Sequence, residues 1–278
     1  MRAPQRDTDT SAEEKSFLTR QISLIRLTRY QAKFMCEGLG TFIFSLTISL
    51  AEMNCGNLAI DGKAHTRNLA PIAGGLMLCV LIFTFGYISG GHFNPAVTFA
   101  VVMIRGMRVE EAMSYWVAQV VGALIGAGLS ILVNGTTRHF PAPQVAQNTA
   151  EHIFSAFIAE AVFTMLLVTV VLHVVYSQQH RNDYYGLAVG MCFLASQYAI
   201  GGVSGGAFNP AVATGLQVAK FIAAGYVTQL TYLWLYWAAP ACGAVGAAFL
   251  FTMTHPVPKD DEEEARQQRA ARNLYSAS

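Results

Sequence analysis

A nine-residue segment that occurs twice constrains the fold of this chain more than any other feature. Residues 89–97, SGGHFNPAV, return as residues 204–212, SGGAFNPAV, 115 positions later and with eight of nine residues identical. The repeat extends beyond the motif, because Glu37 in an early apolar run matches Glu160 in a later one. Helix or strand periodicity does not produce such a match, so we infer an internal duplication.

Six apolar segments are long enough to cross a bilayer. A spanning helix needs about 20 mostly apolar residues, and six segments qualify: 33–54, 69–88, 111–133, 151–176, 186–201 and 229–253. Only 13% of the 278 residues are charged, against about 25% in soluble domains. Each copy of the duplication holds three spans. Because three is odd, the copies insert with opposite orientations, which places a functional site near the membrane midplane.

Two further apolar segments, 94–104 and 209–219, are too short to span. Each has about 11 residues, or roughly 16 Å of helix, half of a hydrocarbon core of about 30 Å. Each begins in one copy of the motif, so two half-helices that enter from opposite faces would meet in the middle. We therefore predict an all-α membrane protein with six transmembrane helices and two re-entrant half-helices in an inverted 3+3 repeat.

The distribution of basic residues predicts the orientation. An even number of spans puts both ends of the chain on one side, and 14 of the 18 Lys and Arg residues fall on that side. This excess predicts that both termini are cytoplasmic. Asn134, in the sequon Asn134-Gly135-Thr136 after the third span, would then lie on the opposite side, where glycosylation is possible.

The motif residues suit a pore that excludes charge. Asn is a favoured N-cap and Pro suits the first helical turn, which gives the two half-helix starts Asn94-Pro95-Ala96 and Asn209-Pro210-Ala211. Each helix N-terminus carries a partial charge of about +0.5, and each Asn amide can donate a hydrogen bond to a passing oxygen. A water held as a double acceptor breaks a proton-conducting chain, and the positive ends repel cations. A mere pair of capped helices is the alternative, which the inverted duplication disfavours.

The backbone before each Asn and two carboxylates complete the predicted site. Unpaired carbonyls at this depth are tolerated only where they are buried or line a water-filled cavity, so we expect pore-lining carbonyls at Gly90, Gly91, His92, Gly205, Gly206 and Ala207. Glu37 and Glu160 lie in apolar runs, where a carboxylate is costly and marks function. A proton relay is one interpretation. Their symmetric placement favours another, in which each braces the loop of its own half by accepting backbone N–H bonds.

Small residues are expected to pack the helices closely. Gly122 and Gly126 on the third span are matched by Gly243 and Gly246 on the sixth. Such spacings allow close helix contact, and we expect these glycines to pack the two halves face to face.

Over residues 33–253 the chain resembles the aquaporin (major intrinsic protein) family, on the strength of the doubled Asn-Pro-Ala motif. The segment 88–92 and Val212 are most similar to the tonoplast-intrinsic-protein-like and protist vacuolar-type branch. The resemblance implies a homotetramer in a lipid bilayer, either a vacuole-type or the plasma membrane. The predicted organisation is a polar segment 1–32, a channel domain 33–253 with repeats 33–133 and 151–253, and a charged tail 254–278.

The resemblance also implies a second constriction, the aromatic/arginine filter. Its four positions fall on Gly74, Gln197, Gly206 and Val212. Water-selective members usually carry an aromatic residue, a His, a small residue and an Arg there, so this chain lacks both the ring and the guanidinium. A wider filter without a positive charge is therefore expected. The Tyr236-Trp237 pair and Ala213, where glycerol channels carry Asp, favour the water branch.

The predicted function is a passive water channel with a relaxed filter. A facilitator of ammonia, urea, glycerol or hydrogen peroxide is the first alternative. An ion-coupled secondary transporter using Glu37 or Glu160 is a remote one. The sequence shows no nucleophile–base pair, metal cluster or phosphate loop, so no enzyme, metal or cofactor is predicted. A basic patch with interleaved aromatics is also missing, which argues against nucleic-acid binding.

Overall fold

The computed structural model describes residues 27–56, 68–135, 140–177, 183–225 and 227–255. Nearly all of the predicted segments 1–32 and 254–278 therefore lie outside the described residues. The described part is all-helical, and six helices are long and apolar enough to cross a membrane. They are α2 (Arg29–Ala51), α3 (Ala70–Ser89), α5 (Val109–Asn134), α6 (Ala150–Val171), α7 (Tyr185–Ser204) and α9 (Leu235–Thr254). Short turns η1 (Glu52–Gly56) and η2 (Leu172–Tyr176) extend α2 and α6, and η3 (Val227–Tyr232) precedes α9.

The six predicted spans correspond to these helices, with differences at their ends: α2 begins four residues before the predicted residue 33 and α9 six residues after the predicted residue 229. The fifth span was expected to stop near Gly201, but α7 continues through Gly201 and Gly202 to Ser204 and has 20 residues. Large apolar side chains cover the outer surface of the bundle; Leu132 is 81% exposed and Phe249 68%. An apolar exterior of this kind is stable in lipid and unfavourable in water.

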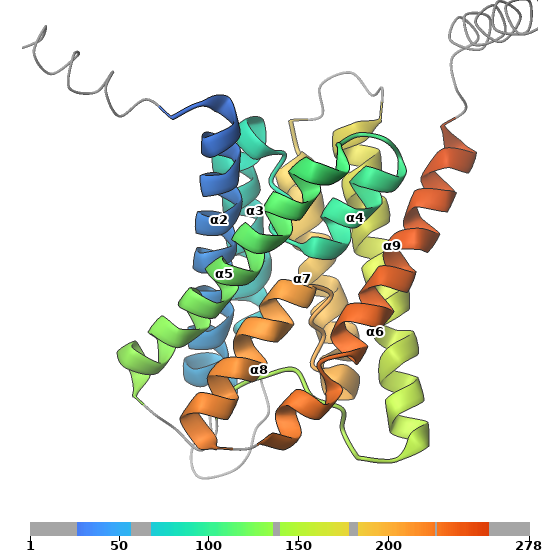
Figure 1. The fold of residues 1–278 in the computed structure, drawn as a ribbon. Coiled ribbons are helices and arrows are strands. Elements are labelled where there is room, and N and C mark those ends of the chain that lie inside the picture. Colours follow the sequence, from blue (N-terminus) through green and yellow to red (C-terminus); the bar gives the residue numbers. More distant parts are fainter. Residues whose placement is uncertain (1–26, 57–67, 136–139, 178–182, 226, 256–278) are drawn as a thin grey trace, which may run out of the picture.

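Two shorter helices enter the bundle from opposite ends. These are α4 (Pro95–Met103) and α8 (Pro210–Ala224), which lie in the upper and lower halves of Figure 1. Helix α8 has 15 residues, so the predicted end at residue 219 was too early. Helix α4 packs on α9 and α8 packs on α5, so each half-helix contacts the last long helix of the other half. This exchange brings the start of each half-helix to the middle of the molecule.

The glycines of α5 and α9 pack within each half, so the prediction that they join the halves was wrong. A Cβ added at Gly122 would lie 2.2 Å from a backbone oxygen of α2, and one at Gly243 would lie 2.3 Å from a backbone oxygen of α6. Helices α2 and α5 thus approach closely, and α6 and α9 do the same.

A different pair of glycines joins the two halves, where α3 packs on α7. A Cβ added at Gly190 would lie 2.4 Å from the carbonyl oxygen of Gly75, and one at Gly75 would lie 2.7 Å from the carbonyl oxygen of Gly190. Side chains at these positions would force the helices apart. The glycine contact therefore sets the distance between the two pore-lining helices α3 and α7.

Candidate functional site

The loop before α4 is held by one buried carboxylate. Glu37 on α2 is fully buried and accepts hydrogen bonds from Ser89 Oγ at 2.7 Å, from the backbone N–H of His92 at 3.0 Å and from that of Phe93 at 2.7 Å. Gln119 Nε2 donates to the same carboxylate at 2.8 Å. These bonds have the geometry that bracing requires. They also occupy both carboxylate oxygens with loop and helix donors.

The loop before α8 repeats this arrangement. Glu160 on α6 is fully buried and accepts from Ser204 Oγ at 2.7 Å and from the backbone N–H groups of Ala207 at 2.9 Å and Phe208 at 2.8 Å. Phe208 has a φ of 50° and its counterpart Phe93 a φ of 46°. An L-residue in this region is strained by about 1–3 kcal/mol and persists only where the surroundings enforce it. The carboxylates hold the N–H group of each strained residue.

The two Asn residues cap their helices and link the two loops. Asn94 Oδ1 accepts from the Ala96 N–H at 2.9 Å, and Asn209 Oδ1 accepts from the Ala211 N–H at 3.0 Å. Each Asn Nδ2 also donates a hydrogen bond to the loop of the other half. Asn94 donates to the Phe208 carbonyl at 2.8 Å, and Asn209 donates to the Phe93 carbonyl at 2.7 Å. An amide nitrogen carries two hydrogens. One N–H of each Asn therefore remains for a molecule in the pore.

One helical turn after Asn94, Thr98 belongs to a polar network around the first loop. The His92 ring contacts Thr98 Oγ1 at 3.0 Å through Nδ1 and the Tyr176 hydroxyl at 2.6 Å through Nε2. Gln119 Nε2 also donates to Thr98 Oγ1 at 3.0 Å. The sequence analysis treated His92 only as a source of a carbonyl and missed these side-chain partners.

An outer cavity of about 510 Å³ opens at the end of the bundle away from the start of α2. Three of the four predicted filter residues, Gln197, Gly206 and Val212, line it. The fourth, Gly74, lies beside them, since a Cβ there would be 3.6 Å from Gln197 Oε1. The structure thus brings three of the positions together in the wall of this outer cavity, called the vestibule below, with the fourth beside them.

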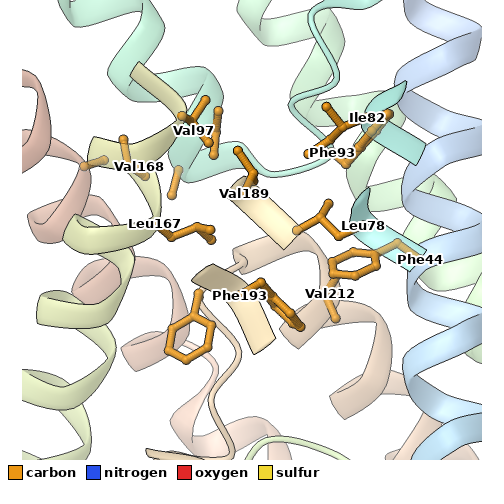
Figure 2. Close-up of a cluster of buried hydrophobic side chains, with 14 of the residues drawn as sticks. Phe44, Leu78, Ile82, Phe93, Val97, Leu167, Val168, Val189, Phe193 and Val212 are labelled. Carbon is orange, nitrogen blue, oxygen red and sulfur yellow. The ribbon is translucent and has the colours of Figure 1, made fainter. Parts of the chain in front are cut away.

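A much smaller inner cavity, of about 20 Å³, lies between the two loops. Both Asn94 and Asn209 line it, together with Gly91 and His92 of the first loop. The other walls are apolar; Figure 2 shows Phe44, Leu78 and Phe193 among them. The inner cavity therefore combines two amide groups with a largely apolar wall.

The predicted carbonyl residues divide between the two cavities. Gly91 and His92 line the inner cavity, and Gly205, Gly206 and Ala207 line the vestibule. Gly90 lines neither cavity; it is the C-cap of α3, and its N–H donates to the Gly86 carbonyl. The remaining five residues are in position to offer backbone groups to the pore.

Phe193 on α7 is a cavity residue that the sequence analysis missed. It is 2% exposed and, within the described part of the chain, is the one residue that lines both the vestibule and the inner cavity. A spacing signal existed, because Phe193 lies four residues before Gln197 and so on the same face of α7.

The predicted glycosylation site is only partly described. Asn134 is exposed at the end of α5, and its Nδ2 lies 3.3 Å from Met53 Sδ. Thr136 of the sequon lies outside the described residues.

Six spanning helices, two inverted half-helices and a cavity between their capped N-termini define an integral, multi-pass membrane protein of the channel class. Comparison with known proteins agrees, since the family described as Major intrinsic protein matches residues 24–251. The chain belongs to this family, whose members are passive channels and not enzymes.

Named relatives span several kinds of channel. Aquaporin-8 of Notomys alexis is 31% identical over 249 residues, which cover 87% of this chain and 90% of the relative. Glycerol uptake facilitator protein-like 6 of Lactiplantibacillus plantarum is 32% identical, with 78% and 95% coverage. The aquaglyceroporin structure from Plasmodium falciparum has a TM-score of 0.68 at 24% identity and covers 80% of this chain and 95% of that one, which shows a shared fold.

Proposed function

We propose that this protein is a passive water channel whose outer filter is relaxed. The observation that carries this proposal is the inner cavity between Asn94 and Asn209. A cavity needs a volume of about 10–15 Å³ to hold one water molecule. The inner cavity has a volume of about 20 Å³. Molecules would therefore pass the Asn pair one at a time.

Charge exclusion follows from the same pair. The N-termini of α4 and α8 converge at the cavity, and each adds about half a positive charge. Each Asn has one free amide N–H, because the other bonds the opposite loop. A water oxygen that accepts a hydrogen bond from each of the two free N–H groups directs its own hydrogens away from the Asn pair. Such a water cannot relay a proton through the pore.

Small neutral solutes are the second candidate cargo. Val212, in place of an arginine, leaves the filter without a fixed positive charge, and it lines the vestibule of about 510 Å³. Gln197 offers both a donor and an acceptor. Ammonia and urea fit this description. Glycerol is considered because one relative is named a glycerol uptake facilitator protein.

We further propose an orientation and assembly for the channel. The Lys and Arg excess supports cytoplasmic termini, so the vestibule would face outward or into a lumen. Residues 33–253 form the channel domain, with repeats 33–133 and 151–253. The family resemblance supports a homotetramer with one pore per subunit, in a vacuole-type or plasma membrane.

The test is stopped-flow light scattering on proteoliposomes. We expect water permeability well above that of empty liposomes, followed by measurable ammonia flux and no proton conductance. Water flux no faster than that of empty liposomes would refute the proposal. Solute flux without water flux would favour the facilitator.

A further inference from the structure

We infer that Phe193 forms the size-selective constriction of this channel and sets which neutral solutes pass. The inference rests on the proposed channel function and moves its narrow point away from the four filter positions. One helical turn, about 6 Å at 1.5 Å per residue, separates Phe193 from Gln197. Gln197 belongs to the wide vestibule, whereas Phe193 also lines the inner cavity.

The position between the cavities is the first argument. The vestibule has about 510 Å³ and the inner cavity about 20 Å³, and among the described residues only Phe193 lines both. A solute that travels from one cavity to the other must therefore pass this ring. Gln197, Gly206 and Val212 all lie on the wide side of it.

Gly74 provides the second argument. A Cβ at Gly74 would lie 3.1 Å from Phe193 Cε1, so the phenylalanine ring occupies the space beside the filter position that lacks a side chain. A side chain at position 74 would already press on the present Phe193 ring with its Cβ atom. The ring expected from α3 is thus replaced by one from α7, placed deeper in the pore.

Neighbouring rings fix the orientation of Phe193. The Phe44 ring lies 5.2 Å away at an interplanar angle of 65°, and the Phe208 ring lies 5.8 Å away at 87°. Both are edge-to-face contacts, which aromatic pairs favour. Figure 2 shows Phe193 with Phe44, Leu78 and Val212 around the same space. A ring held on two sides cannot easily turn aside for a wide solute.

The apolar surroundings of Phe193 also discriminate between water and larger polar solutes. The side chains of Phe44, Leu78 and Phe193 offer no hydrogen-bond partner; Gln197 lies in the vestibule on one side, and the Asn pair lines the inner cavity on the other. Single-file water keeps hydrogen bonds to its neighbours in the chain. A polyol with several hydroxyl groups would lose partners here, and polar groups without partners are costly. We therefore expect glycerol to be excluded and smaller solutes to pass.

The experiment compares Phe193→Val with the wild type in proteoliposomes for water, urea and glycerol. Wild type should pass water and exclude glycerol. The variant should raise glycerol flux by about tenfold or more, the range that small steric differences in a pocket produce, while water flux persists. Phe163→Val is the matched control, because Phe163 packs on Phe208 but lines neither cavity.

The outcomes separate the two proposals. Glycerol flux that stays unchanged in a water-conducting Phe193→Val channel would overturn the inference, and so would free glycerol passage in the wild type. If Phe193→Val does not fold, Phe193→Leu should give a smaller increase, and its absence counts equally against the inference. A wild type that conducts no water refutes the proposed function itself.

Discussion

Replacing Glu160 by Gln tests whether this carboxylate is a brace. The substitution keeps the size of the side chain but exchanges one acceptor oxygen for an NH2 group. If the remaining oxygen keeps Ser204 and Ala207 as donors, the amide faces the N–H of Phe208, which is fully buried. Two donor groups would then point at each other.

The magnitude follows from these three bonds. An unpaired buried donor costs about 1–3 kcal/mol, and a hydrogen bond to a charged group is worth about 1 kcal/mol more than a neutral one. The loss would be about 3–5 kcal/mol, part of which is offset because a neutral amide need not be stripped of as much hydration. We expect a net destabilisation of about 2–4 kcal/mol. The φ of 50° at Phe208 would then be enforced less strongly, which would displace Asn209.

The assay is thermal unfolding in detergent together with water permeability per folded channel. At about 2–4 °C per kcal/mol for domains of this size, the midpoint should fall by about 5–15 °C. Water permeability should fall as well. Glu151→Gln, an exposed position on the same helix, is the control. If Glu160→Gln shifts the midpoint no more than this control and conducts normally, the brace is not needed.

Three further predictions test the pore and the packing. Val212→Arg should reduce ammonia and urea flux while water flux persists, because it places a positive charge in the vestibule wall; unchanged solute flux in the solute panel would contradict a role for this position. Asn209→Asp should weaken ion exclusion and stability, since a carboxylate oxygen cannot donate to the Phe93 carbonyl now 2.7 Å away; normal exclusion in conductance recordings would leave Asn209 as a cap only. Gly190→Ala should destabilise the detergent-solubilised protein by about 1–3 kcal/mol through overpacking. The control Gly128→Ala should not, because a Cβ at Gly128 meets no neighbour within 4 Å. Equal unfolding midpoints for the two variants would refute the close contact of α3 and α7.

The features that depend on segment length and duplication could be predicted from the sequence. Span length is set by bilayer thickness, and the doubled motif marks both half-helices. The symmetric positions of Glu37 and Glu160 favour a bracing role over a proton relay, and both carboxylates accept backbone N–H bonds from their loops. These arguments need only one-dimensional order and charge.

The role of Phe193 could not be predicted in the same way. Helix α7 is mostly apolar; Gln197 marks the face that also carries Phe193, but this spacing does not show how far the Phe193 ring reaches into the pore. The contact with Gly74 depends on how closely α3 and α7 cross, which the glycine pair between them sets. Neither distance is encoded in local spacing. The glycine at position 74 therefore predicts an open filter, although in the structure the Phe193 ring of α7 occupies the space beside it.

The two repeats differ at three positions that carry polar side chains in the first repeat. His92, Thr98 and Gln119 correspond to Ala207, Ala213 and Pro240, so polar residues of the first half become residues without polar side chains in the second.

The three polar residues of the first half meet in space beside Glu37. The first loop therefore has a side-chain network in addition to its carboxylate. The second loop depends more heavily on Glu160, because alanine and proline side chains at the matching positions can donate no hydrogen bond. It follows that Glu160→Gln should impair water conduction more than Glu37→Gln, since the first loop has other supports. Equal loss of conduction in both variants would mean that the network adds nothing to the hold on the first loop.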